Sequence, residues 1–244
     1  MRRYAQYCPV AKATEVLGDR WTPLILREML IGATGFNELE RALPGISRSI
    51  LRDRLRRLER AEVVERKTGP TGRTLEYALT PAGRDLRPVI KALGDWGATW
   101  SFAEPRRDEL DPDLLIVWMA RHVDGGELPS TRTVVQFDLR SPAKRYWMVF
   151  EPEDVSVCLQ HPGFDVDLKV AVDTAVLHRV WAGRTGLREM LGVGALRLNG
   201  PIALQRAFTR WFKWSPFAPA ARRAEERRSS ARRLDAPVRV RIAG

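Results

Sequence analysis

The sequence predicts a multidomain α+β protein: an N-terminal unit of helices closed by a β-hairpin, then an α+β domain with a mostly antiparallel five-stranded sheet and helices on one side. Three observations lead to this prediction. The chain has 244 residues, more than one small core usually accommodates. Apolar residues recur at helical spacing through most of the first hundred positions, whereas from Val135 they alternate as in strands. A polar, proline-containing segment at 104–109 separates two apolar patterns and is expected to be a linker.

Composition and charge favour nucleic acid as a partner. There are 41 Lys and Arg residues against 30 Asp and Glu, a formal net charge of +11. The excess lies in residues 1–104, with 18 basic and 13 acidic residues, and in residues 217–244, with 8 and 3. Residues 105–216 are almost neutral, with 15 and 14. A basic head and tail around a neutral middle indicate that the parts have different partners.

Several classes of protein are disfavoured. The longest apolar run, Leu114 to Ala120, is too short to cross a bilayer, and the chain does not start with an apolar signal segment. We therefore expect a cytoplasmic protein with no membrane partner. Cys8, Cys158 and three scattered histidines make neither a zinc site nor a disulfide framework, so no metal and no cofactor is expected. The sequence contains no phosphate loop, dinucleotide fingerprint or nucleophile elbow, which argues against an enzyme.

The first sixty residues are expected to form four helices, bounded by glycines and by one Pro-Gly break: Ala11–Leu17, Thr22–Leu30, Phe36–Leu43 and Ser47–Ala61. Gly18 is predicted to end the first helix as a left-handed cap, and Gly32 ends the second. Pro44-Gly45 separates the third helix from the fourth, which Ser47 caps.

The fourth helix has two distinct sides. Leu51, Leu55 and Leu58 form one narrow stripe that should face a core. The opposite side is polar and rich in arginine: Ser49, Arg52, Arg56 and Arg60. A solvated charged face is one interpretation of this pattern. The scarcity of acidic residues, only Asp53 and Glu59 in this helix, favours contact with phosphates.

A hairpin follows the helices. Strands are expected at Val63–Lys67 and Thr74–Leu79, joined by a turn that carries Arg73. This order, helices followed by a hairpin with a basic tip, is typical of a winged helix-turn-helix. In that fold one helix enters the major groove of DNA, and the hairpin, called the wing, reaches the backbone or the minor groove. The predicted DNA contacts are Ser47, Arg48, Ser49, Arg52, Arg56 and Arg73.

Thr80-Pro81 ends the hairpin and opens a further helix with a continuous apolar seam: Leu86, Val89, Ile90, Leu93, Trp96 and Trp100. One interpretation is that the seam packs on its own domain, taken as residues 1–103. The other is that it pairs two copies of the chain, because dimeric helix-turn-helix proteins match two DNA half-sites.

These residues carry a family resemblance over about residues 5–100. The motifs occur in order: Cys8-Pro9, Gly18-Asp19-Arg20-Trp21, Gly35-Phe36-Asn37-Glu38-Leu39, Pro44-Gly45-Ile46-Ser47, Leu51-Arg52-Asp53-Arg54-Leu55 and Glu76 to Arg84. The chain thus resembles the HxlR-type regulators, which implies a dimeric winged-helix transcription factor with its recognition helix at Ser47–Ala61. Glu62 departs from the small residue usual before the first wing strand. Cys8 occupies the place of a cysteine that senses oxidants or electrophiles in some members.

Residues 110–216 are expected to form the α+β domain. Asp111-Pro112 starts an apolar helix, and alternation at Val166–Val172 predicts the clearest strand. Asp165 and Asp167 share a strand face with Lys169, which indicates a solvated surface in preference to a catalytic pair. Five of the eight tryptophans fall in this domain: Trp118, Trp147, Trp181, Trp211 and Trp214.

The order of strands and helices in this domain, with the run Gly194-Ala195-Leu196-Arg197-Leu198-Asn199-Gly200, resembles the sterol-carrier-protein-like lipid-binding domain. That resemblance implies an apolar tunnel and a half of the protein that senses a hydrophobic small molecule. No ligand-contacting residue carries over by position. A well-filled core is the alternative interpretation.

Residues 217–244 contain paired arginines and few apolar positions. Part of this segment could form a helix but not pack as a core element, so a disordered or loosely docked basic tail is expected, with non-specific DNA affinity as a second hypothesis. Together these inferences predict a one-component transcriptional regulator that binds double-stranded DNA as a homodimer and responds to an apolar ligand. The alternative is a lipid or hydrophobic-ligand carrier whose winged helix serves mainly dimerisation.

Overall fold

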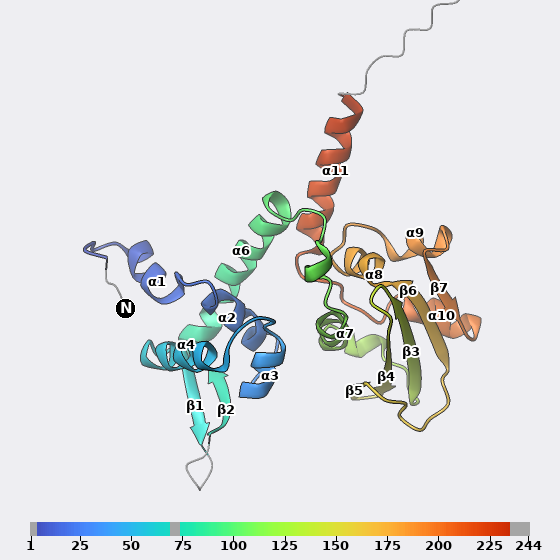
Figure 1. The fold of residues 1–244 in the computed structure, drawn as a ribbon, viewed down its shortest axis with the longest axis horizontal. Coiled ribbons are helices and arrows are strands. Elements are labelled where there is room, and N and C mark those ends of the chain that lie inside the picture. Colours follow the sequence, from blue (N-terminus) through green and yellow to red (C-terminus); the bar gives the residue numbers. More distant parts are fainter. Residues whose placement is uncertain (1–3, 69–73, 235–244) are drawn as a thin grey trace, which may run out of the picture. The chain divides into compact units, whose positions relative to one another are not determined.

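The computed structural model describes residues 4–68 and 74–234, which form two compact units, Met1–Leu93 and Gly94–Gly244 (Figure 1). The boundary falls inside a helix, α6, and not after it at residue 103. The elements of the first unit are α1 Pro9–Leu17, α2 Thr22–Leu30, α3 Phe36–Arg41, α4 Arg48–Arg60, β1 Val64–Thr68, β2 Thr74–Leu79, α5 Pro81–Asp85 and α6 Arg87–Trp100.

Local sequence signals set most helix ends in this unit. The Ser47 hydroxyl caps α4 by accepting a hydrogen bond from the Ile50 amide at 3.2 Å, and Thr80 caps α5 in the same way through the Gly83 amide at 3.1 Å. Gly32 has a φ of 105°, the left-handed conformation expected after a helix. The prediction for Gly18 was wrong, because its φ is −78°. Gly18 instead closes α1 through its amide, bonded to the Thr14 carbonyl.

The core of the first unit forms where α2, α3 and α4 meet the hairpin. Its fully buried members include Ile25, Leu26, Leu39 and the leucine stripe of α4. Strands β1 and β2 pair antiparallel, with Val64 opposite Leu79. The Tyr77 amide donates to the Thr34 carbonyl at 2.8 Å, so the hairpin is tied to the segment that precedes α3.

Glu62 lies between α4 and β1 and adopts a φ of +56°. This left-handed conformation is costly for residues with a side chain, by about 1–2 kcal/mol. The departure from a small residue noted in the sequence therefore leaves the winged-helix plan intact and places local strain at this turn.

The second unit contains the remaining elements: α7 Pro112–Arg121, β3 Thr133–Arg140, β4 Lys144–Glu151, β5 Asp154–Cys158, β6 Leu168–Asp173, α8 Thr174–Trp181, α9 Leu187–Gly192, β7 Leu196–Asn199, α10 Ile202–Phe208 and α11 Ala218–Leu234. Asp111, where the sequence predicted a helix start, caps α7 by accepting a hydrogen bond from the Asp113 amide, and Asp173 caps α8 by accepting one from the Ala175 amide.

The five-stranded sheet has the order β5-β4-β3-β6-β7. Three pairings are antiparallel, and the central pair of β3 with β6 is parallel, with Val135 opposite Leu168. The sheet is therefore mixed, and the prediction of a mostly antiparallel sheet was only partly right. The cause is the connection 159–167, which leads from the edge strand β5 back to the far side of β3, so that β6 enters the sheet in the direction of β3.

Helices and aromatic rings fill the space over one face of this sheet. Leu168, Val170 and Val172 of β6 are fully buried there, beside apolar residues of α7, α8 and α10. Phe150 lies 4.9 Å from Trp211, and Phe208 lies 5.3 Å from Phe212, measured between ring centroids. Where the sterol-carrier resemblance implied a tunnel, this part of the unit holds a close-packed aromatic core.

The C-terminal segment differs from the expected disordered tail. Residues Ala218–Leu234 form the helix α11, while the last ten positions, 235–244, lie outside the described residues. Ala218, Ala220, Ala221 and Ala224 are buried. Alanine side chains are thus sufficient to form the packed face of this helix. The prediction considered only large apolar residues and therefore missed this face.

No helix in residues 4–68 or 74–234 combines the length and the apolar character needed to cross a membrane.

One half-buried histidine links the stability of the second unit to pH. Burial lowers the pKa of His178 on α8, although a hydrogen bond to the Asp111 backbone acts in the opposite direction. The unfolded chain therefore binds the proton more readily than the folded chain below the ordinary pKa of 6.5. We expect the free energy of unfolding of this unit to fall as the pH drops from about 7.5 to about 5.5.

Urea unfolding followed by tryptophan fluorescence across this pH range measures the slope, and His178→Gln should flatten it. His161→Gln is the control, because that side chain lies in an exposed loop. Equal slopes for the wild type and His178→Gln would contradict the assignment.

Candidate nucleic-acid interface

The helix α4 buries one side and exposes the other. Leu51, Leu55 and Leu58 are at most 2% exposed, as the sequence predicted. The opposite side holds the predicted polar row, and all its members are exposed: Ser49, Arg52, Arg56 and Arg60. Because α-helical positions advance by about 100° per residue, burial of the leucine stripe determines that this row faces outward.

The arginines of the exposed row have no acidic partner within the described part of the chain. No ion pair involves Arg52 or Arg56, and the guanidinium of Arg60 donates to the Arg56 carbonyl at 3.3 Å. The Arg52 guanidinium lies 5.9 Å from the centroid of the Phe36 ring. Three exposed cations on successive turns of the helix form a positively charged row, of the kind that attracts phosphates.

Arg48 and the serines at the start of α4 are held by local contacts. Arg48 forms an ion pair with Glu40, donates to Asn37 Oδ1 at 3.1 Å and stacks over Phe36 at 4.9 Å. The Ser47 and Ser49 hydroxyls are 3.0 Å apart. The Ser47 hydroxyl therefore serves as the N-cap of α4. Arg48 is exposed at the start of α4, where its contacts with α3 hold it in place.

The flank of α4 is anchored by a carboxylate that the sequence analysis did not single out. Asp19 accepts hydrogen bonds from the amides of Trp21 and Thr22 and pairs with Arg54 Nε at 2.5 Å. Burial raises the pKa of Asp19, but these hydrogen bonds and Arg54 outweigh burial and hold it below the ordinary value. Asp19 lies three residues before the first residue of α2, and its carboxylate accepts from the amide of Trp21, which precedes the helix, and from that of Thr22, which begins it.

The arginines of α4 are thus divided into two groups. Arg54 and Arg57 pair with Asp53 at 2.7 and 3.0 Å and stay on the flank of the helix. Those of the exposed row remain available to an anion. A helix with free guanidinium groups can enter the major groove, where arginine binds guanine through two hydrogen bonds and neighbouring arginines bind phosphates.

The wing is formed by β1 and β2, and its described cations are paired. Arg66 lies 3.4 Å from Glu59, and Lys67 lies 2.9 Å from Glu76. The predicted wing contact Arg73 lies outside the described residues, so its part in the interface stays a prediction.

The apolar seam of α6 is narrower than predicted. Ile90 is buried in the core of the first unit and Leu86 packs against the same core, so these two residues anchor the helix on its own unit. The other four are exposed and share one stripe of the helix: Val89 at 47%, Leu93 at 54%, Trp96 at 61% and Trp100 at 68%. We call these four residues the α6 stripe.

The two cysteines lie far apart in the chain. Cys8 is half-buried at the N-cap of α1, and Cys158 is half-buried at the end of β5. No disulfide involves either of them. Across the described residues, no group of three His, Cys, Asp or Glu side chains is arranged to hold a metal ion.

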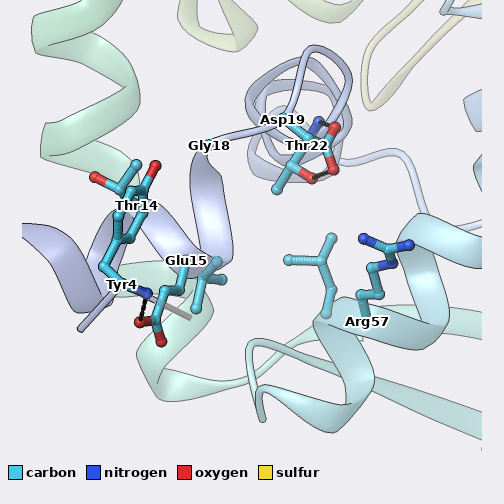
Figure 2. A pocket seen from close by; sticks show the side chains of 9 residues that line it. Tyr4, Thr14, Glu15, Gly18, Asp19, Thr22 and Arg57 are labelled. Carbon is cyan, nitrogen blue, oxygen red and sulfur yellow. Dashed lines mark hydrogen bonds between the residues drawn. The ribbon is translucent and has the colours of Figure 1, made fainter. Parts of the chain in front are cut away.

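A polar pocket of about 200 Å³ lies between α1, the turn that follows it and α4 (Figure 2). Figure 2 shows Tyr4, Thr14 and Glu15 on one side and Arg57 on the other. The charged groups have partners: Glu15 accepts from the Tyr4 amide at 2.9 Å and from Lys12 at 3.1 Å, and Arg57 pairs with Asp53. This pocket lies in the first unit and is polar, unlike the apolar site expected in the second.

Comparison with known proteins matches residues 16–105 to the HxlR-like helix-turn-helix family. The chain is 38% identical over 98 residues to an uncharacterized HTH-type transcriptional regulator of Bacillus subtilis, YvaP, a match that spans 91% of that protein and 39% of this chain. It is 34% identical over 105 residues to YdeP of the same organism, across 77% of that protein and 43% of this chain.

Among solved structures, the reduced form of the transcriptional regulator YodB from B. subtilis is 34% identical. That match spans 95% of YodB and 39% of this chain, with a TM-score of 0.35. Each of these matches leaves more than half of this chain uncovered. Because the chain spans nearly all of YvaP at 38% identity, it belongs to the HxlR-like helix-turn-helix family of transcriptional regulators, which are not enzymes.

Proposed function

We propose that this regulator acts in the cytoplasm by binding double-stranded DNA as a homodimer, with α4 in the major groove. The observation that supports the proposal is the exposed arginine row of α4, which lacks acidic partners among the described residues and is oriented by a buried leucine stripe. The contacts proposed on this helix are Ser47, Arg48, Ser49, Arg52 and Arg56. Arg73 is proposed at the wing.

The positions along α4 suggest different roles. Arg48, Ser49 and Arg52 lie in the first turns of the helix, the part that reaches base edges in helix-turn-helix proteins. Arg52 is proposed to bind a guanine, because it is exposed, unpaired and placed beside the Phe36 ring. Arg56 and Arg60 lie further along and are proposed to hold phosphates.

The α6 stripe is proposed as the dimer contact. Four large apolar side chains exposed on one stripe of a helix are unusual for a surface, and burying them against a second copy removes that area from water. A two-fold pair of chains also presents two copies of α4 to two half-sites, which a short recognition helix needs for specific binding.

The second unit is proposed to sense an apolar small molecule. Its residues 105–216 are nearly neutral, with 15 basic and 14 acidic residues, and its core is rich in tryptophan and phenylalanine. The helix α6 begins in the first unit and ends in the second, so a ligand that favours one conformation of the second unit acts on the helix that carries the proposed dimer contact. A redox role of Cys8 is a further proposal, supported by its place at the start of α1.

Arg52→Ala is expected to blur base preference, whereas Arg60→Ala is expected to weaken binding to all DNA about equally. A lost guanine contact costs about 1–3 kcal/mol at one base position, and a lost phosphate contact lowers the salt slope by about 1. Titrations against single-base variants of a duplex selected from a random library measure both effects. Arg188→Ala, an exposed arginine of α9, is the control. An unchanged base preference in Arg52→Ala would refute the assignment.

Light scattering at micromolar concentration is expected to give twice the chain mass of 27.7 kDa. Leu93→Glu should yield a monomer, because it places a charge in the centre of the α6 stripe. Ile202→Glu changes an equally exposed apolar residue of α10 and should remain a dimer. A wild-type monomer that still binds a single operator tightly would contradict the dimer proposal.

A molecule that co-purifies with the protein and is identified by mass spectrometry is expected to change operator affinity by about 5–150-fold, the usual span of allosteric coupling. Fluorescence anisotropy of labelled operator at fixed salt measures the change, and quenching of tryptophan fluorescence reports saturation. If the molecule saturates the protein but the binding curve for the operator does not change, the result would support a carrier function and contradict the sensor proposal.

A further inference from the structure

The helix α11 is a basic rod with one covered side. Its 17 residues include six arginines and two glutamates. Figure 1 shows that its first turns lie beside α8, whereas its C-terminal part extends away from the sheet of the second unit. This helix is part of neither the winged helix-turn-helix nor the five-stranded sheet, and the proposed function has so far given it no role.

Close packing of small side chains holds the covered side of α11. Ala220 and Ala221 are buried together with Ala98 of α6, against the Phe217 ring. A Cβ added to Gly94 would lie 2.1 Å from that ring, and one added to Gly183 would lie 2.5 Å from Ala218 Cβ. The two glycines therefore permit contacts that no larger residue allows, and these contacts fix which side of α11 faces solvent.

The charges of α11 are distributed unevenly around the helix. Glu225 accepts from Arg184 at 3.1 Å, and Arg184 is itself only 5% exposed, so this carboxylate neutralises a buried cation. Arg228 lies 3.6 Å from the same carboxylate, and Arg227 stacks on Trp100 at 5.2 Å. Arg222 and Arg223 are exposed and form no ion pair with any residue that the structure describes.

We propose that α11 is a second DNA-binding element that contacts the phosphate backbone through Arg222 and Arg223. This inference rests on the proposed function, since it takes the regulator's own DNA as the polyanion. Charge complementarity identifies the occupant: two adjacent unpaired guanidinium groups on a fixed helix suit phosphates. A membrane surface fits less well, because the alanines of α11 at 218, 220, 221 and 224 are already buried.

The contact is expected to be independent of base sequence. Each phosphate neutralised by a cation releases counterions and adds about 0.9 to the slope of log K against log salt. The variant Arg222→Gln/Arg223→Gln should therefore lower the slope by about 2 for each bound chain, and by about 4 for the proposed homodimer. The same loss is expected for a random-sequence duplex of about 30 base pairs and for the selected operator. Base preference at the operator should not change. Glutamine keeps the helix propensity of arginine, so circular dichroism should match the wild type.

The experiment titrates full-length protein by fluorescence anisotropy between about 50 mM and about 200 mM salt. The matched control is Arg188→Gln/Arg206→Gln, which removes the same charge from exposed positions of the same unit and should leave the slope within error. Arg52→Ala is measured in parallel, because it reports on α4 alone.

The outcomes separate the two proposals. A lower slope in the α11 variant and not in the control supports the inference, whether or not Arg52→Ala alters base preference. An unchanged slope in the α11 variant, with altered preference in Arg52→Ala, overturns the inference and leaves the role of α4 intact. Equal losses in the α11 variant and the control also overturn it, because they show only an effect of net charge.

Discussion

Burial of the leucine stripe of α4 is the constraint on which the proposed interface depends. Leu51, Leu55 and Leu58 are together almost completely removed from water, and each such side chain contributes about 1.5–3 kcal/mol. A rotation of the helix by half a turn would expose all three and bury guanidinium groups without partners, which costs far more. The orientation of the arginine row is therefore a consequence of core packing.

Electrostatic pairing then separates the structural arginines of the first unit from the ones that remain free. Asp19 and Asp53 form ion pairs with Arg54 and Arg57, and this network connects the turn after α1 to α4. Glu40 takes Arg48. These ion pairs, whose Asp19, Asp53, Arg54 and Arg57 side chains are half-buried, set where the long side chains lie. Arg52, Arg56 and Arg60 have no acidic partner among the described residues, and together with the exposed Arg48 they make up the cations of the proposed interface on α4.

The second unit follows a different principle, in which apolar and aromatic contacts dominate. Its sheet is covered on one face by helices and a cluster of rings that includes Phe150, Phe208 and Trp211. Entry of an apolar ligand there requires displacement of these rings, so ligand binding and a change of conformation would be linked. In the same unit, α11 packs against the last turns of α6. A change in the conformation of the second unit would therefore act on the helix that carries the α6 stripe.

The sequence by itself determined the features that depend on neighbours within a few turns. The Ser47, Thr80, Asp111 and Asp173 caps, the leucine stripe of α4 and the hairpin were all predictable, because capping and helical periodicity act over about four to ten residues. The order of motifs in residues 5–100 was sufficient to identify the family. The arginine row followed from the same periodicity.

Tertiary structure alone decided the features that require distant partners. The parallel pairing of β3 with β6 depends on a return connection between strands more than thirty positions apart, which alternation along one strand does not specify. Ile90 and its neighbours on the α6 stripe are all apolar, and only the packed core shows that Ile90 faces inward. In α11 the alanines become a buried face only because Gly94, Ala98 and Gly183 leave room for close approach. Whether a small side chain is surface or core depends on what lies opposite it, and the local sequence does not contain that information.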